Sequence, residues 1–173
     1  MTLVFQYGSN CSESEINSEG RLRGDAKFSG IAETVEDFEL AFDVQSTRRG
    51  CAASDIVRKH GGKTWGVLYE VPDYLIKRET AKARRRKSFD EIEGESTNYK
   101  RETIEVRRAN GDVVQALTYT VKAPQPGLKT NVEYVRHIVC GLREHGVPDE
   151  HITKVKAIAT ANNPDIAAEV EKL

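Results

Sequence analysis

The sequence predicts an α+β fold, because strand-like segments fill the first two thirds of the chain and helical segments gather in the last third. Apolar residues recur at roughly alternating spacing in much of the stretch up to residue 121, and at helical spacing after residue 130. Strands and helices do not alternate as the βαβ units of a parallel sheet require. With 173 residues, no internal repeat and no low-complexity linker, the chain is expected to form a single domain over residues 1–173.

The first expected element is a strand that turns sharply into a short helix. The largely apolar residues 3–7 precede Gly8, which permits backbone angles closed to other residues and lets a ligand approach the main chain. Ser9 and Asn10 are good N-cap residues, and a helix is predicted over residues 12–19. The amide N–H groups of such a turn can bind an anion or a developing oxyanion. On the pattern alone, however, a junction that binds nothing is the better interpretation.

Several strands are then expected before residue 122. The segment 26–44 shows alternating apolar spacing, with Gly30 as a candidate bulge. Pro72 ends the strand expected over residues 64–71, which is rich in β-branched and aromatic residues. The dipeptide Asn110-Gly111 predicts a tight hairpin turn. The remaining strands are expected over residues 51–57, 101–107 and 113–121.

A basic insert occupies roughly residues 75–89, with its charge concentrated between Lys77 and Lys87. Such a run can bind an anionic ligand or nucleic acid. No aromatic side chain lies among these charges, and the acidic remainder of the chain brings the net charge to -1. A solvated surface segment is therefore the preferred interpretation, and nucleic acid is not the expected partner.

Helices are expected in the C-terminal part, over about residues 130–173. Thr130 or Asn131 is the expected N-cap of the first helix, whose apolar residues keep helical spacing. Pro148 begins a second helix. A last short helix is predicted over residues 165–173.

Composition argues against several classes of function. No apolar run approaches the ~20 residues of a membrane helix, and the first residues lack the layout of a signal peptide. The three cysteines are too few and too scattered for a disulfide framework or a zinc site, and the four histidines lack ligands at metal spacing. We therefore expect a cytoplasmic protein without a metal or a membrane partner, monomeric by default, with a dimer left open.

Glu93 is the candidate general base. Asp90, Glu91 and Glu95 flank it, and both crowding by other carboxylates and burial raise the pKa of a carboxyl group. A group with a raised pKa can accept a proton near neutral pH. A solvated acidic cluster is the alternative, and composition alone favours it.

Three tyrosines, Tyr99, Tyr119 and Tyr134, are candidates for a pocket wall. Their hydroxyl groups could bind a polar substrate while their rings enclose it. Tyrosines in strands more often pack in the core, so the residues alone leave both interpretations open.

Several short motifs follow one another along most of the chain. They are Tyr7-Gly8-Ser9-Asn10, Trp65-Gly66-Val67-Leu68-Tyr69, Glu93-Gly94 with Tyr99 shortly after, Ala116-Leu117-Thr118-Tyr119, Tyr134, and the late Gly141 with Gly146-Val147-Pro148. In this order they resemble the γ-glutamylcyclotransferase-like family. The resemblance implies a small mixed β-barrel of about six strands with flanking helices, which agrees with the α+β class.

The resemblance also implies an activity: cleavage of a γ-glutamyl amide to 5-oxoproline and an amine or amino acid, without a cofactor. Glu93 matches the catalytic glutamate of the family. The residues that match its substrate-binding positions are Tyr7, Gly8, Ser9, Asn10, Tyr99, Tyr119 and Tyr134.

Two departures from the family pattern bear on the substrate. Cys11 follows Asn10 where a leucine or methionine is expected, and the stretch from Tyr74 to Glu93 is longer and carries the basic insert. The leaving group is therefore left open. Two other functions are also left open: a module that binds a small anionic ligand without reaction, and a nucleic-acid or acidic-protein partner that uses the basic insert.

Overall fold

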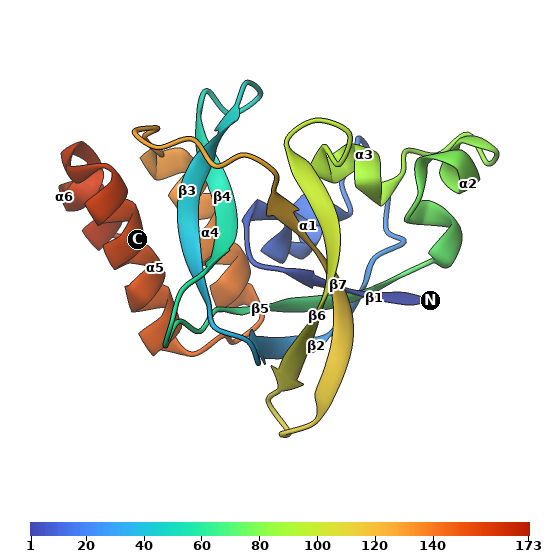
Figure 1. Ribbon diagram of the computed structural model, residues 1–173, viewed down its shortest axis with the longest axis horizontal. Helices are drawn as coiled ribbons and strands as arrows, with labels where there is room; N and C mark the ends of the chain where they lie inside the picture. Colours follow the sequence, from blue (N-terminus) through green and yellow to red (C-terminus); the bar gives the residue numbers. More distant parts are fainter.

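A computed structural model describes all 173 residues, and five strands in it form a closed barrel in the order β1-β5-β2-β6-β7 (Figure 1). β1 runs antiparallel to β5 and parallel to β7, and the pairing with β7 closes the barrel. The expected α+β class, a mixed barrel with flanking helices, is confirmed. The barrel strands are β1 (Thr2–Gln6), β2 (Lys27–Thr34), β5 (Trp65–Val71), β6 (Tyr99–Arg108) and β7 (Val113–Val121).

Two further strands lie outside the barrel, so the barrel has five strands where about six were expected. β3 (Phe38–Ser46) and β4 (Cys51–Arg58) pair only with each other, as an antiparallel ribbon. Every second residue of β3 from Phe38 to Val44 is buried, and β3 packs against helix α5 (Asp149–Asn162). The apolar face of the ribbon is thus covered by a helix, and Figure 1 shows the ribbon between the barrel and the C-terminal helices.

Two predicted features of the strands are confirmed. The pairing of β2 with β5 shifts register between Phe28 and Gly30, where Gly30 has a φ of 123°, so the expected bulge is present. Asn110-Gly111 joins β6 to β7, with the Asn110 side chain accepting the Asp112 N–H at 3.1 Å.

The first helix is shorter than predicted. A 3-10 turn, η1 (Ser9–Cys11), precedes α1, which covers Glu13–Ile16 instead of residues 12–19. The side chain of Asn17 exchanges two hydrogen bonds with the backbone of Ala26, at 2.8 and 3.0 Å. These bonds hold the chain in a loop that leads to β2, and the helix therefore ends after one turn.

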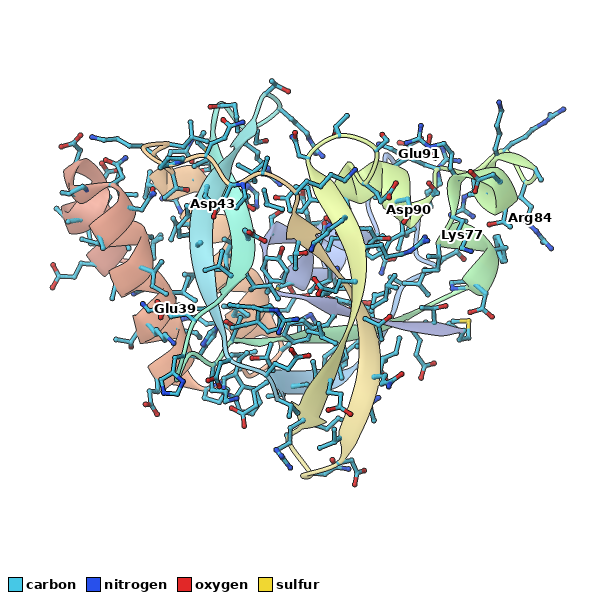
Figure 2. The ribbon with its side chains drawn as sticks, viewed as in Figure 1. Glu39, Asp43, Lys77, Arg84, Asp90 and Glu91 are labelled. Carbon is cyan, nitrogen blue, oxygen red and sulfur yellow. The ribbon has the colours of Figure 1, made fainter.

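The turn η2 (Asp73–Leu75) leads into the basic insert, and the short helix α2 (Arg78–Lys82) lies within it. Most charged residues of the insert are exposed. Figure 2 shows Arg84 at the periphery of the molecule, and its guanidinium lies 4.3 Å from the centre of the Tyr74 ring. Arg86 is the exception, because it is half-buried and pairs with Asp25 at 2.6 Å.

Helix α3 (Phe89–Glu93) follows the insert and ends on the candidate base. Ser88 begins it with a capping box, in which its side chain accepts the Glu91 N–H and the Glu91 side chain accepts the Ser88 N–H. Gly94, with a φ of 70°, terminates it. Both ends of this five-residue helix are thus fixed by local chemistry, which fixes the position of Glu93.

The C-terminal part is helical as predicted. Asn131 caps α4 (Val132–Glu144) by accepting the Tyr134 N–H at 2.9 Å, which decides between the two candidate caps. α5 begins directly after Pro148, and a 3-10 turn, η3 (Pro164–Ile166), leads to α6 (Ala167–Glu171). None of the helices combines the length and the apolar character needed to cross a membrane.

Candidate active site

A pocket forms where the turn after β1 meets β4, α3, β6, β7 and α4; we call it the inner pocket. All eight residues singled out in the sequence line it, although they come from distant parts of the chain. Two more residues, Gln6 and Ser54, complete the lining, and no sequence motif marked either of them. The full lining is Gln6, Tyr7, Gly8, Ser9, Asn10, Ser54, Glu93, Tyr99, Tyr119 and Tyr134.

Gly8 allows the turn after β1 to lie directly against β4. A Cβ atom at this position would overlap Ser54 Oγ, so a larger residue requires Ser54 to move. The Gly8 N–H donates to no acceptor within the protein. A free amide in the lining of a pocket is suited to bind a carboxylate or a developing oxyanion.

Ser54 is held by two of the predicted tyrosines. The Tyr134 hydroxyl lies 2.8 Å from Ser54 Oγ and accepts the Ser54 N–H at 3.1 Å. Tyr99 donates its hydroxyl to the Ser54 carbonyl at 2.8 Å. Ser54 therefore joins the ribbon to β6 and α4, and only the folded arrangement reveals this role.

Tyr119 also has its hydroxyl bonded to the protein, since it donates to Asp90 Oδ1 at 2.7 Å. Tyr7 in turn donates to the Tyr119 carbonyl at 2.5 Å. The tyrosine rings thus form a rigid wall whose hydroxyls already have protein partners. Direct hydrogen bonds from these hydroxyls to a substrate stay a prediction.

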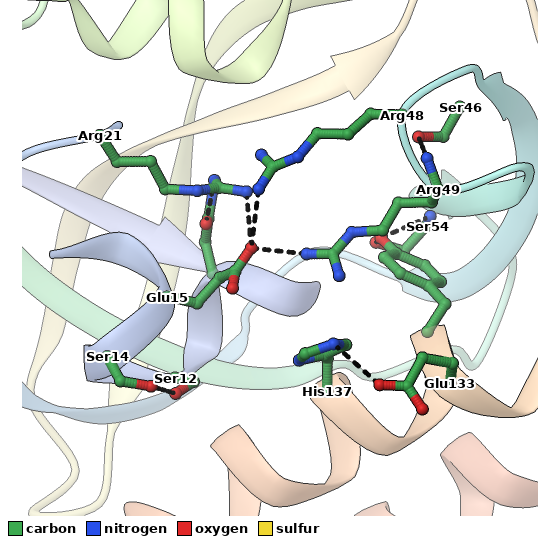
Figure 3. Close-up of polar contacts among 12 residues, drawn as sticks. Ser12, Ser14, Glu15, Arg21, Ser46, Arg48, Arg49, Ser54, Glu133 and His137 are labelled. Carbon is green, nitrogen blue, oxygen red and sulfur yellow. Dashed lines mark hydrogen bonds and ion pairs between the residues drawn. The ribbon is translucent and has the colours of Figure 1, made fainter. Parts of the chain in front are cut away.

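Glu93 is connected to the N-terminal turn through Asn10. The Asn10 side-chain N–H donates to Glu93 Oε1 at 2.7 Å, while Arg21 donates to Asn10 Oδ1. Arg21 also donates to Glu15 Oε1 at 2.8 Å (Figure 3). Because Arg21 occupies the amide oxygen, Asn10 can present only its N–H group to Glu93. No motif marked Arg21 or Glu15.

Burial of its carboxylate raises the pKa of Glu93 above the ordinary value. The hydrogen bond from Asn10, the charge of Arg21 and a hydrogen bond from Gln6 act in the opposite direction. The sequence predicts a raised pKa for Glu93, and the structure agrees with that direction. Burial is the cause of the shift, and crowding by neighbouring carboxylates is not.

Two of the three acidic neighbours of Glu93 are paired elsewhere. Asp90 binds Arg101 at 2.8 Å, and Glu91 is engaged by Ser88 in the capping box. Figure 2 labels both carboxylates on α3. The third neighbour, Glu95, lines neither pocket, so Glu93 is the member of the acidic cluster that faces the inner pocket.

A second, larger cavity of about 420 Å³ adjoins the inner pocket; we call it the outer chamber. Ser9, Asn10, Glu93, Tyr99 and Tyr134 line both spaces. The outer chamber continues toward the β3–β4 turn, where Arg48 and Arg49 contribute to its wall. A ligand that reaches Glu93 from the inner pocket can therefore extend outward past the same carboxylate.

Residues 63–155 match the family model of the AIG2-like family. The chain belongs to the AIG2-like family. The match includes Glu93, Tyr99, Tyr119 and Tyr134, and it begins after the turn that carries Tyr7 to Asn10. No curated protein matches the sequence.

Solved structures share the fold over most of the chain. A structure named gamma-glutamyl cyclotransferase is 22% identical, covers 99% of both chains and has a TM-score of 0.75. An uncharacterized protein from Homo sapiens is 25% identical, with a TM-score of 0.74 over 91% of this chain and 87% of that one. YkqA from Bacillus subtilis is 21% identical, with a TM-score of 0.72 over 93% of this chain and 55% of its own.

Proposed function

We propose that this protein is a γ-glutamylcyclotransferase-type enzyme that converts a γ-glutamyl amide to 5-oxoproline and a free amine or amino acid. The observation that carries the proposal is the carboxylate of Glu93, which has a raised pKa, is oriented by Asn10 and faces a pocket walled by tyrosines. Membership of the AIG2-like family and the shared fold with a gamma-glutamyl cyclotransferase support it.

The reaction needs one group that accepts a proton and later returns it. Ionised Glu93 takes a proton from the α-ammonium of the substrate, and the free amine attacks its own γ-carbonyl carbon. The new C–N bond closes a five-membered ring and leaves a tetrahedral oxyanion. When the bond to the leaving nitrogen breaks, Glu93 delivers its proton to that nitrogen, and the extra proton on the new ring nitrogen passes to the released amine, so the reaction ends with a neutral lactam and an ammonium ion and consumes no water.

The pocket lowers the barrier mainly by positioning. The nucleophile and the carbonyl belong to one molecule, so the protein has to hold the glutamyl chain in a folded conformation. The rigid tyrosine wall and the close approach of Gly8 to Ser54 suit that task. The free Gly8 N–H is the candidate donor to the substrate carboxylate or to the oxyanion.

Mass-spectrometric detection of 5-oxoproline, after incubation with a panel of γ-glutamyl amino acids and γ-glutamyl amines, tests the proposal. We expect product from the wild type and about 10²–10⁴-fold less from Glu93→Gln, which keeps the shape but removes the base. Glu95→Gln is the matched control, because Glu95 lines neither cavity. Equal turnover by Glu93→Gln and the wild type would exclude Glu93 as the base.

The alternative of a binding module makes a different prediction in the same experiment. Stoichiometric binding of a γ-glutamyl compound by calorimetry, with no 5-oxoproline from any substrate, would show a pocket that recognises its ligand without reaction.

A further inference from the structure

The outer chamber is placed to receive the leaving group of the proposed reaction. Glu93 lies on the boundary between the two cavities, and in the proposed mechanism it protonates the leaving nitrogen. With the glutamyl part in the inner pocket, the remainder of the substrate extends into the outer chamber. The chemistry of that chamber therefore bears on which leaving group is accepted, and this step rests on the proposed function.

Positive charge dominates the outer chamber. Arg21, Arg48, Arg49 and Lys87 line it. The carboxylates in its lining are Glu93 and Glu91, and Glu91 is already engaged in the cap of α3. A wall of this kind favours an anionic ligand and disfavours a cation.

Three guanidinium groups converge on one further carboxylate, that of Glu15 (Figure 3). Arg21 and Arg49 lie 2.8 and 2.5 Å from Glu15 Oε1, and both side chains are mostly buried. Arg49 also lies over the Tyr134 ring, 5.6 Å from its centre. These two arginines are therefore fixed parts of the wall, and one carboxylate is shared among three positive charges.

Arg48 is different from its two neighbours. Its guanidinium lies 3.8 Å from Glu15 Oε1, makes no hydrogen bond in the protein, and its side chain is 69% exposed. Lys87 is also exposed and forms no ion pair. Arg48 and Lys87 thus provide two charged groups with free donors at the outer chamber.

The position of Arg48 is set by the turn between β3 and β4. Ser46 accepts the Arg49 N–H with its hydroxyl at 3.2 Å and the Gly50 N–H with its carbonyl at 2.8 Å. Gly50 adopts a φ of 65°, which a glycine tolerates without strain. The turn is therefore well defined, and the exposed Arg48 side chain extends from it without a hydrogen bond.

We propose that Arg48, assisted by Lys87, binds a carboxylate on the leaving group, so that the substrates are γ-glutamyl amino acids or peptides and not γ-glutamyl polyamines. A guanidinium matches the planar carboxylate with two parallel hydrogen bonds. A polyamine would place a second ammonium group among Arg48, Arg49 and Lys87, where like charges repel it.

A matched pair of substrates tests this proposal. γ-Glutamylalanine and γ-glutamylethylamide differ only in the leaving-group carboxylate, and kcat/KM is measured for both by release of 5-oxoproline. We expect the wild type to prefer γ-glutamylalanine by about tenfold or more, since a charged hydrogen bond is lost with the ethylamide. Arg48→Gln should reduce this preference several-fold, Arg48→Lys should retain part of it, and raising the salt concentration should weaken it.

Lys82→Gln is the control, because Lys82 is exposed, basic and outside both cavities. Equal kcat/KM for the two substrates in the wild type, or an unchanged preference in both Arg48→Gln and Arg48→Glu, would overturn the carboxylate subsite and leave the proposed reaction intact. No 5-oxoproline from either substrate, or from the wider panel, would instead refute the proposed reaction itself.

Discussion

At the scale of single residues, the site depends on how one amide is oriented. Asn10 can stabilise the ionised form of Glu93 only while its N–H group faces the carboxylate. Arg21 holds that orientation by donating to the amide oxygen, and Glu15 in turn holds Arg21. Arg21 is thus a positioning residue that acts on the proposed base through its neighbour and through its charge.

We expect Arg21→Gln to shift the acid limb of the pH profile of kcat/KM to higher pH. Arg21 lowers the pKa of Glu93, and its removal raises that pKa, so that ionised Glu93 appears only at a higher pH. The expected shift is roughly one pH unit, and Arg21→Lys should recover part of it. Arg136→Gln is the control, because Arg136 is exposed and pairs with the exposed Glu133. If Arg21→Gln lost activity without movement of the acid limb, the role of Arg21 would be purely structural.

At the scale of elements, helix α4 supports the turn that carries Asn10. Gly141 lies where α4 crosses η1, and a Cβ atom there would lie 2.5 Å from Ser12 N and 2.8 Å from the Cys11 carbonyl carbon. Backbone atoms on both sides leave no flexible side chain to move aside. The helix and the turn are therefore in direct backbone contact, and the position of the helix sets that of the turn.

Gly141→Ala should separate α4 from η1 and lower both stability and activity. Overpacking of this kind costs about 1–3 kcal/mol in the free energy of unfolding, which denaturant titration measures. Activity at a temperature where the variant remains folded should fall as well, because Asn10 moves with the turn. Cys140→Ala is the control, because Cys140 is exposed on the same helix, and it should change neither quantity appreciably. An equally small effect of Gly141→Ala would show that α4 and η1 are not in tight contact.

At the scale of the whole molecule, a buried carboxylate joins the ribbon to the barrel. Asp55 on β4 accepts the Val121 N–H of β7 at 2.9 Å and is 2% exposed. Burial raises its pKa to about 6, with a smaller contribution from Asp43. Because the folded-state pKa lies above the ordinary value, protonated Asp55 favours the folded protein below about pH 4, and this contribution is lost as the pH rises through 6.

Relative to the wild type, Asp55→Asn should therefore be more favourable for stability at pH 8 than at pH 4. Asparagine keeps an oxygen that can accept the Val121 N–H, but it carries no charge to bury. The difference in unfolding free energy between variant and wild type should change by up to about 3 kcal/mol between these pH values. Urea titrations at both pH values measure it, and an equal difference at pH 4 and pH 8 would show that Asp55 keeps an ordinary pKa.

Much of this protein is determined by local sequence. The α+β class, the bulge at Gly30 and the turn at Asn110-Gly111 follow from side-chain periodicity and from backbone preferences that act over a few residues. The motifs also marked eight residues of the inner pocket, because each lies in a short, recognisable string.

Tertiary structure alone decided the remainder. The separation of β3 and β4 from the barrel, the roles of Ser54 and Arg21, and the pairing of Asp90 away from Glu93 depend on residues far apart in the chain. Burial and charge pairing are properties of the folded surroundings, so a string of carboxylates in the sequence cannot show which one faces the pocket. For the same reason, the cationic outer chamber, built from an early loop, a hairpin turn and the basic insert, was not visible in any single motif.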